Sequence, residues 1–119
     1  PDVIEGSMTS YLEREVKTLD PKSVGAVVVG FDEHFSYGKM MKASSILGAN
    51  EQCEFLATNA DVVHRYPMFS LPGTGAIFQA LEACVGRKAL VLGKPNPVIC
   101  KTLMAKGLKP ERTLMIGDW

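Results

Sequence analysis

The stretch from Leu90 to Asp118 contains two motifs, Leu92-Gly93-Lys94-Pro95-Asn96-Pro97 and Leu114-Met115-Ile116-Gly117-Asp118. Each is an apolar run typical of a β-strand that ends in glycine followed by a charged residue, and one helix-length segment separates the two. Charged groups at the C-terminal ends of neighbouring strands are typical of an α/β active-site rim. A cation beside an acid suits a site that handles phosphate with a divalent metal ion. We therefore single out Lys94 and Asp118.

The rest of the chain alternates helix patterns with strand patterns. Helices are predicted from Met8 to Leu19, from Ser36 to Gly48, from Pro72–Gly75 to Gly86 and from Asn96 to Gly107, and strands at Val24–Phe31, Cys53–Thr58, Ala89–Leu92 and Thr113–Ile116. The β-branched run Val24–Phe31 predicts a strand that is buried on both faces. Cys84 and Met104 are expected to face inward on their helices. Short connections between alternating elements predict an α/β fold with a mostly parallel sheet flanked by helices.

A long loop is predicted from Asn59 to Leu71, and loops of this length inside a compact domain are usually functional or disordered. Its hydrogen-bonding groups, cation and aromatic rings suit a wall that faces a ligand. A single histidine such as His64 is more often a surface or packing residue than a catalytic one. No second His, Cys or Ser stands at a spacing that would indicate a triad or a metal cluster.

The composition excludes several classes of protein. The 119 residues are 46% apolar and 22% charged, which is typical of one globular domain or parts of two. Thirteen basic and thirteen acidic residues cancel, so no strong field recruits nucleic acid or an anionic membrane. The apolar runs are too short to span a bilayer. Three widely spaced cysteines favour reduced thiols, and hence a cytoplasmic protein.

Each motif also has a simpler interpretation. An isolated Gly-Lys-Pro is usually a solvated lysine, and a Gly-Asp at a strand end is usually a turn; only the order and separation of Lys94 and Asp118 are informative. Asp32 also ends a strand, but no second aspartate or glycine-rich turn follows it, so we interpret it as structural. Gly73-Thr74-Gly75 favours a tight helix entry over a nucleotide-binding loop, because the third glycine is missing.

Five motifs together resemble one known family. They are Val27-Val28-Val29-Gly30-Phe31-Asp32, Ala57-Thr58-Asn59-Ala60-Asp61, Pro72-Gly73-Thr74-Gly75, Gly93-Lys94-Pro95 and Met115-Ile116-Gly117-Asp118. Their order resembles that of haloacid-dehalogenase (HAD) superfamily phosphatases, in the branch with 4-nitrophenylphosphatases and phosphoglycolate and pyridoxal-phosphate phosphatases. The resemblance extends from about Val24 to Asp118.

The resemblance implies an architecture and a set of roles. Residues 1–92, or about 20–92, would form the large α/β cap that selects the substrate, and residues 93–119 would begin the returning Rossmann-like core. Lys94 matches the catalytic lysine of the family, and Asp118 matches a ligand of Mg²⁺. Asn59, Asp61 and His64 fall in and beside the substrate-specificity loop of the cap. The substrate would be a small phosphorylated metabolite.

The chain also departs from the family. The nucleophilic Asp-x-Asp-Gly motif is absent, and Trp119 stands where the family has arginine. We therefore expect a fragment that is inactive by itself. Caps of this branch can form homodimers, for which Tyr66, Met68 and Phe69 would supply apolar anchors. The alternative function is accordingly a non-catalytic α/β module for association.

Overall fold

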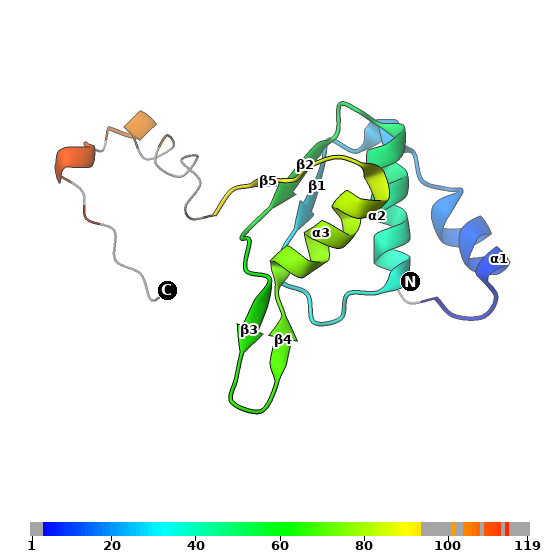
Figure 1. Ribbon diagram of the computed structural model, residues 1–119. Coiled ribbons are helices and arrows are strands. Elements are labelled where there is room, and N and C mark those ends of the chain that lie inside the picture. Colours follow the sequence, from blue (N-terminus) through cyan, green and yellow to red (C-terminus); the bar gives the residue numbers. More distant parts are fainter. Residues whose placement is uncertain (1–3, 94–100, 102–103, 108, 113, 115–119) are drawn as a thin grey trace.

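A computed structural model of the chain describes residues 4–93, 101, 104–107, 109–112 and 114 (Figure 1). The two residues on which the motif analysis rests, Lys94 and Asp118, lie outside these described residues. So do the predicted strand Thr113–Ile116, apart from Leu114, and most of the predicted helix from Asn96 to Gly107. A single 3₁₀ turn, Pro110–Arg112, is described near this end of the chain.

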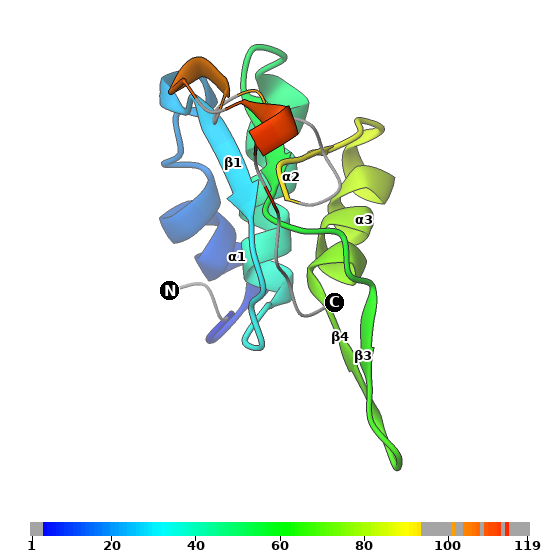
Figure 2. The ribbon, with the colours of Figure 1, turned by 90° about the vertical axis from the view of Figure 1, so that its left-hand side faces the viewer.

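A three-stranded parallel sheet forms the centre of the described fold. Its strands are β1 (Ala26–Val29), β2 (Glu54–Ala57) and β5 (Leu90–Val91), in the order β1-β2-β5. Helix α2 (Tyr37–Ala49) connects β1 to β2, and α3 (Thr74–Val85) precedes β5. Both helices lie on the same face of the sheet (Figures 1 and 2). The predicted α/β class with a parallel sheet is confirmed.

The core lies between that face and the two helices. The pairing register places Val27 beside Phe55 and Val29 beside Ala57, so these side chains point the same way. Phe55, Ala57 and Val29 are buried together with side chains from both helices. The cluster consists of Val29, Leu47, Cys53, Phe55, Ala57, Ile77, Phe78 and Leu81.

The opposite face of the sheet is open in the described part of the chain. Val28 is 58% exposed and Leu90 is 46% exposed, and both register with Leu56 on that face. The prediction that Val24–Phe31 is buried on both faces is therefore wrong for the described residues. The reason is topological: both connections run in the same direction along the sheet, and right-handed crossovers then place both helices on one face.

The N-terminal helix packs against α2. It begins as α1 (Met8–Tyr11), with Ser7 accepting from the Ser10 N–H, and continues as a π-helical segment, Leu12–Val16. The Tyr11 side chain is completely buried, and the Lys42 ammonium lies 3.2 Å from Glu15 on the following turn. The predicted helix is confirmed, although its second half is not a regular α-helix.

Two expectations about apolar side chains are wrong. Cys84 is exposed because the buried stripe of α3 is centred on Phe78 and Leu81, which leaves the thiol at its edge, beside α2. Met104, expected to pack inward, is 45% exposed. Among the described cysteines, Cys53 is a buried free thiol and Cys84 an exposed one.

Arg87 joins the end of α2 to the start of β2. Its guanidinium donates to the carbonyl oxygens of Leu47 at 3.0 Å, Asn50 at 3.3 Å and Cys53 at 2.6 Å. Asn50 is itself buried, and its side-chain amide donates to the Pro21 carbonyl oxygen at 2.9 Å. The corner that precedes β2 is therefore held by side-chain donors from two different segments.

The substitution Arg87→Met is expected to lower the free energy of unfolding by about 1.5–3 kcal/mol, the usual cost of losing hydrogen bonds to a charged group. The methionine keeps the length of the side chain but leaves the three carbonyl oxygens without the guanidinium. Urea unfolding followed by circular dichroism measures the change. The matched control is Lys88→Met, since the Lys88 side chain is 90% exposed. Equal losses in the two variants would contradict the assigned role of Arg87.

Candidate functional site

Two segments meet where the parallel strands end. Gly30–Asp32 follows β1, and Thr58–Asp61 follows β2, so both lie at the C-terminal edge of the sheet. This edge is where open α/β sheets bind their ligands. The Thr58 N–H donates to the Val29 carbonyl oxygen at 2.9 Å, which extends the pairing as far as the first residue of the second segment.

The predicted loop from Asn59 to Leu71 contains an antiparallel hairpin. Strands β3 (Val63–Arg65) and β4 (Ser70–Pro72) pair in register, with His64 opposite Leu71 (Figures 1 and 2). The Tyr66 N–H donates to the Phe69 carbonyl oxygen at 2.8 Å, and the two rings are stacked with centroids 5.1 Å apart. The prediction of a loop without strands is therefore wrong. Pro67 at the second position of a tight turn is the sequence signal that could have revealed the hairpin.

Of the predicted site residues, Asn59 and Asp61 lie together. The Asn59 side-chain amide donates to the Asp61 carboxylate at 2.9 Å, and the Thr58 hydroxyl donates to the Asn59 side-chain oxygen at 2.9 Å. Asp61, at one end of this row of hydrogen bonds, is exposed to solvent. Asn59 and Asp61, joined by this hydrogen bond, form what we call the polar edge of the site.

His64 lies nearby, on β3, and is exposed. The rings of His64 and Phe31 form an edge-to-face pair, with their centroids 6.2 Å apart and their planes at 80°. His64 and Asp61 also border the same glycine: a Cβ added at Gly73 would lie 3.3 Å from His64 Nε2 and would overlap the Asp61 carbonyl. The structure thus brings the end of β1, the segment after β2 and the hairpin to one place.

Three glycines allow this close approach. A Cβ at Gly75 would lie 2.5 Å from the Ala60 carbonyl oxygen, and one at Gly93 would overlap the Thr58 carbonyl. Together with Gly73 they pack on the backbone of the segment that carries Asn59 and Asp61. The Gly75 N–H already donates to the Asp61 carbonyl oxygen at 2.8 Å. Gly73 and Gly75 therefore form a tight helix entry at the start of α3, as expected, and the Gly75 N–H is not directed at a phosphate.

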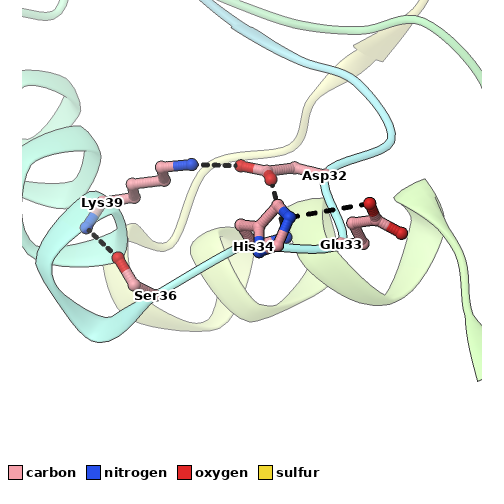
Figure 3. Close-up of polar contacts among 5 residues, drawn as sticks. All are labelled: Asp32, Glu33, His34, Ser36 and Lys39. Carbon is pink, nitrogen blue, oxygen red and sulfur yellow. Dashed lines mark hydrogen bonds and ion pairs between the residues drawn. The ribbon is translucent and has the colours of Figure 1, made fainter. Parts of the chain in front are cut away.

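Asp32 has partners that the sequence did not reveal. Its carboxylate accepts from the Lys39 ammonium at 2.7 Å and from the His34 backbone N–H at 2.9 Å (Figure 3). The hydrogen bond from Lys39, followed by the one from His34, holds the pKa of the Asp32 carboxyl below its usual value. The only sequence signal is the position of Lys39 one turn into a helix that Ser36 caps.

We expect the contribution of Asp32 to stability to depend on pH. Because the folded-state pKa is lowered, the stabilisation is present above the ordinary unfolded pKa of about 3.9 and is lost as the pH falls through the folded-state value. The substitution Asp32→Asn should therefore destabilise the chain at pH 7 and make progressively less difference below about pH 4. Urea unfolding at a series of pH values measures this.

The matched control is Glu33→Gln, because the Glu33 carboxylate lies 3.6 Å from the exposed His34 ring and both side chains are largely in solvent (Figure 3). This variant should differ little from the unsubstituted chain across the series. A constant gap between Asp32→Asn and the unsubstituted chain from pH 7 to acid would contradict the linkage.

A hollow of about 320 Å³ runs beside β1, between the sheet and its helices. Its apolar wall includes Phe35, Ile77 and Leu81, and the Asp32–Lys39 pair borders it. Asn59, Asp61 and His64 do not line it, so the hollow and the polar edge are separate features.

In the part of the chain that the structure describes, no group of three or more His, Cys, Asp or Glu residues could hold a metal ion. Also within that part, none of the helices has the length and apolar character needed to cross a membrane.

Comparisons with known proteins identify the relatives of the chain. No family model matches it. It is 40% identical over 104 residues to glycerol-3-phosphate phosphatase of Gallus gallus, with 84% of this chain and 32% of that protein covered. It is 42% identical over 97 residues to chronophin of Homo sapiens, with 80% and 32% covered. With glycerol-3-phosphate phosphatase of Rattus norvegicus it shares 39% identity over 122 residues, which cover 99% of this chain and 36% of the relative.

Solved structures give the same result. The 4-nitrophenylphosphatase of Thermotoga maritima matches with a TM-score of 0.64 and 33% identity, over 80% of this chain and 36% of that one. The glycerol phosphate phosphatase of Mycobacterium tuberculosis, solved in complex with magnesium, matches with a TM-score of 0.60 and 28% identity, over 70% and 25%. The chain spans about a third of the length of the curated relatives it matches. The resemblance predicted from the motifs is thereby confirmed, and the chain is related to one part of the phosphatases of the haloacid-dehalogenase superfamily.

Proposed function

We propose that the 119 residues belong to a Mg²⁺-dependent phosphomonoesterase that hydrolyses a small phosphorylated metabolite through an aspartyl-phosphate. The observation that carries this proposal is the 39–42% identity to glycerol-3-phosphate phosphatases and chronophin. The similarity to a 4-nitrophenylphosphatase structure supports the same reaction class. Because the chain spans about a third of these relatives, the activity is proposed for a protein that also contains the nucleophilic core.

Within that protein, residues 1–92 would form the cap and residues 93–119 would begin the returning core. The buried Tyr11 and the pairing of Lys42 with Glu15 support including the N-terminal helix rather than starting the cap near residue 20. Asn59, Asp61 and His64 would form the wall of the cap that faces the substrate. This proposed role is supported by the location of the three residues, which lie together at the C-terminal edge of the sheet.

The chemistry would require two groups from the start of the core. The ammonium of Lys94 would neutralise charge on the transferring phosphoryl group, and the carboxylate of Asp118 is the kind of oxygen ligand that Mg²⁺ prefers. The metal ion, when bound, would offset charge on the phosphate oxygens. The magnesium complex of the relative from Mycobacterium tuberculosis supports this choice of metal. The attacking aspartate would come from a motif that this chain does not contain.

A chimaera tests the proposal. The whole 119-residue chain replaces the matching stretch of rat glycerol-3-phosphate phosphatase, whose alignment covers 99% of this chain. We expect the purified chimaera to hydrolyse 4-nitrophenyl phosphate with Mg²⁺, and EDTA to abolish the reaction. The isolated chain, measured alongside, should be inactive because it lacks the nucleophile.

Two results would overturn the proposal. One is a folded chimaera with no magnesium-dependent hydrolysis although the unmodified rat enzyme is active in the same assay. The other is hydrolysis by the isolated chain at a rate close to that of the rat enzyme, since the nucleophile would then have to lie within these 119 residues.

The second candidate function is association through the hairpin. Its tip presents apolar side chains to solvent, with Met68 91% exposed, Phe69 58% and Tyr66 52%. An exposed cluster of large apolar side chains is typical of a surface that binds another protein. A second copy of the chain is the partner we propose, as in a homodimer formed through the cap.

For this candidate we expect Met68→Ser combined with Phe69→Ser to weaken self-association by at least tenfold in dissociation constant, because each serine removes roughly 1–2 kcal/mol of apolar burial. Sedimentation equilibrium measures the constant, and Arg65→Ser on the same hairpin is the control. A strictly monomeric unsubstituted chain at high concentration would exclude association through this tip.

We also propose a cytoplasmic location. It rests on the free thiols of Cys53 and Cys84 and on the balanced charge of the chain. Cell fractionation of the complete protein tests it, and recovery in a secreted or membrane fraction would contradict it.

A further inference from the structure

We propose that Asp32 is a positioning residue: by holding the turn after β1 to Lys39, it keeps the Phe31 ring against His64 and so sets the direction of the His64 imidazole. The inference depends on the proposed function for its catalytic meaning, because only there does His64 face a substrate. The geometry itself joins two neighbouring segments, the turn after β1 and the first turn of α2, to the hairpin, which is distant from both in sequence (Figures 1 and 3).

The turn after β1 is held at two points by one carboxylate. One oxygen of Asp32 accepts from the His34 N–H at 2.9 Å, which closes the turn locally. The other accepts from the Lys39 ammonium at 2.7 Å, which joins the turn to the first turn of α2 (Figure 3). Both side chains keep about a third of their surface exposed, 33% for Asp32 and 32% for Lys39. The pair is therefore partly shielded from solvent, unlike the neighbouring Glu33–His34 pair.

Phe31 needs such support because the core does not supply it. Its side chain is 57% exposed and stands next to Asp32 at the end of the strand. The Phe35 N–H donates to the Asp32 carbonyl oxygen at 3.2 Å, so the backbone turns sharply directly after Phe31. The direction of the Phe31 ring consequently depends on a turn that the Asp32 carboxylate holds.

The His64 ring depends in turn on Phe31. Among the described residues, no hydrogen bond reaches the imidazole, and its ring contact is the edge-to-face pair with Phe31, whose centroid lies 6.2 Å away. An edge-to-face pair of this kind is directional. A Cβ added at Gly73 would lie 3.3 Å from His64 Nε2, so the glycine backbone is also close to the imidazole. The imidazole therefore has two neighbours: the Gly73 backbone, whose N–H donates to the Val62 carbonyl oxygen, and an aromatic ring that follows the turn held by Asp32.

Nuclear magnetic resonance of the 119-residue chain tests this coupling without any assay of activity. The chain has two histidines, so the His64 ring resonances are assigned by comparison with a His34→Gln variant. The variants are Asp32→Ala, Lys39→Met and their combination, with Glu33→Gln as the matched control. Glu33→Gln removes the same charge as Asp32→Ala from the adjacent position but leaves the Asp32–Lys39 pair intact, so a shift of the His64 ring signals in Asp32→Ala and Lys39→Met alone reports the coupling through Phe31.

We expect Asp32→Ala and Lys39→Met each to move the His64 ring signals by more than a linewidth, and the double variant to move them no further than the larger single change. Glu33→Gln should leave them in place, and Phe31→Leu should abolish the ring-current contribution. Unmoved His64 signals in a folded Asp32→Ala chain would overturn the proposal. If Asp32→Ala does not fold, Lys39→Met decides by the same criterion.

The result is independent of the phosphatase proposal. A shift of the His64 signals together with an inactive chimaera would support the coupling and remove its catalytic meaning. Unmoved signals together with an active chimaera would overturn the coupling and leave the phosphatase assignment intact.

Discussion

Replacement of Leu81 by alanine is expected to lower the free energy of unfolding by about 2–5 kcal/mol, the range observed when large side chains are truncated in a packed core. Leu81 is 1% exposed and belongs to the cluster that joins α3 to the sheet. The cluster lies on one side of a three-stranded sheet, so few other side chains can close over the cavity. Domains are stable by only about 5–15 kcal/mol, and the loss would be a large part of that total.

Urea unfolding followed by circular dichroism measures the effect as a lower midpoint at an unchanged slope. Gln79→Ala is the matched control, because Gln79 is exposed on the same helix and alanine keeps the helix propensity high. If Leu81→Ala and Gln79→Ala had the same urea midpoint of unfolding, the packing of Leu81 in the core would not contribute to stability.

The two long helices could be predicted because their signals are local. Ser36 accepts from the Lys39 N–H as an N-cap, and Gly86 ends α3 in the left-handed conformation with φ of 70°. The apolar spacing of Ile77 and Leu81 placed both side chains in the core, where the structure has them. Caps and helical spacing act within one or two turns, so a single sequence is enough to read them.

The one-sided sheet could not be predicted because it depends on which elements cover each face. Val28 and Val29 are chemically identical, yet Val28 is 58% exposed and Val29 is 6% exposed. A continuous β-branched run is compatible with cover on one or both faces, and only the direction of the two crossovers decides. The hairpin was missed for a different reason: three-residue strands are too short to show a clear alternation.

The candidate site was predicted in part. The proximity of Asn59 and Asp61 follows from their spacing at a strand end, and His64 follows them closely in the chain. Contacts across the fold leave no local signal: the edge contact between Phe31 and His64, and the approach of Gly75 to the Ala60 carbonyl, depend on how separate segments pack. The pairing of Asp32 with Lys39 is closer in sequence, but its signal, a lysine one turn into a capped helix, is too common to predict an ion pair.

The substitution Lys94→Met in the active chimaera is expected to lower kcat by about a hundred- to a thousandfold, the usual effect of removing one group that stabilises transition-state charge. The fall should appear in kcat and in kcat/KM alike, because an ammonium aimed at a transferring phosphoryl group acts mainly on the transition state. Steady-state kinetics with 4-nitrophenyl phosphate and saturating Mg²⁺ measure both parameters.

Lys88→Met is the matched control for that experiment, since Lys88 is the preceding lysine in the sequence and its side chain is 90% exposed. Its loss should leave both parameters within twofold. A Lys94→Met chimaera that retains both full kcat and full kcat/KM would show that the lysine takes no part in the reaction. A rise in KM with kcat unchanged would assign Lys94 to uniform binding of the phosphate, because the interaction would then be equally strong in the ground state. Only an equal loss in both parameters supports the role proposed for Lys94, which in the sequence directly follows Gly93, the glycine that packs on Thr58.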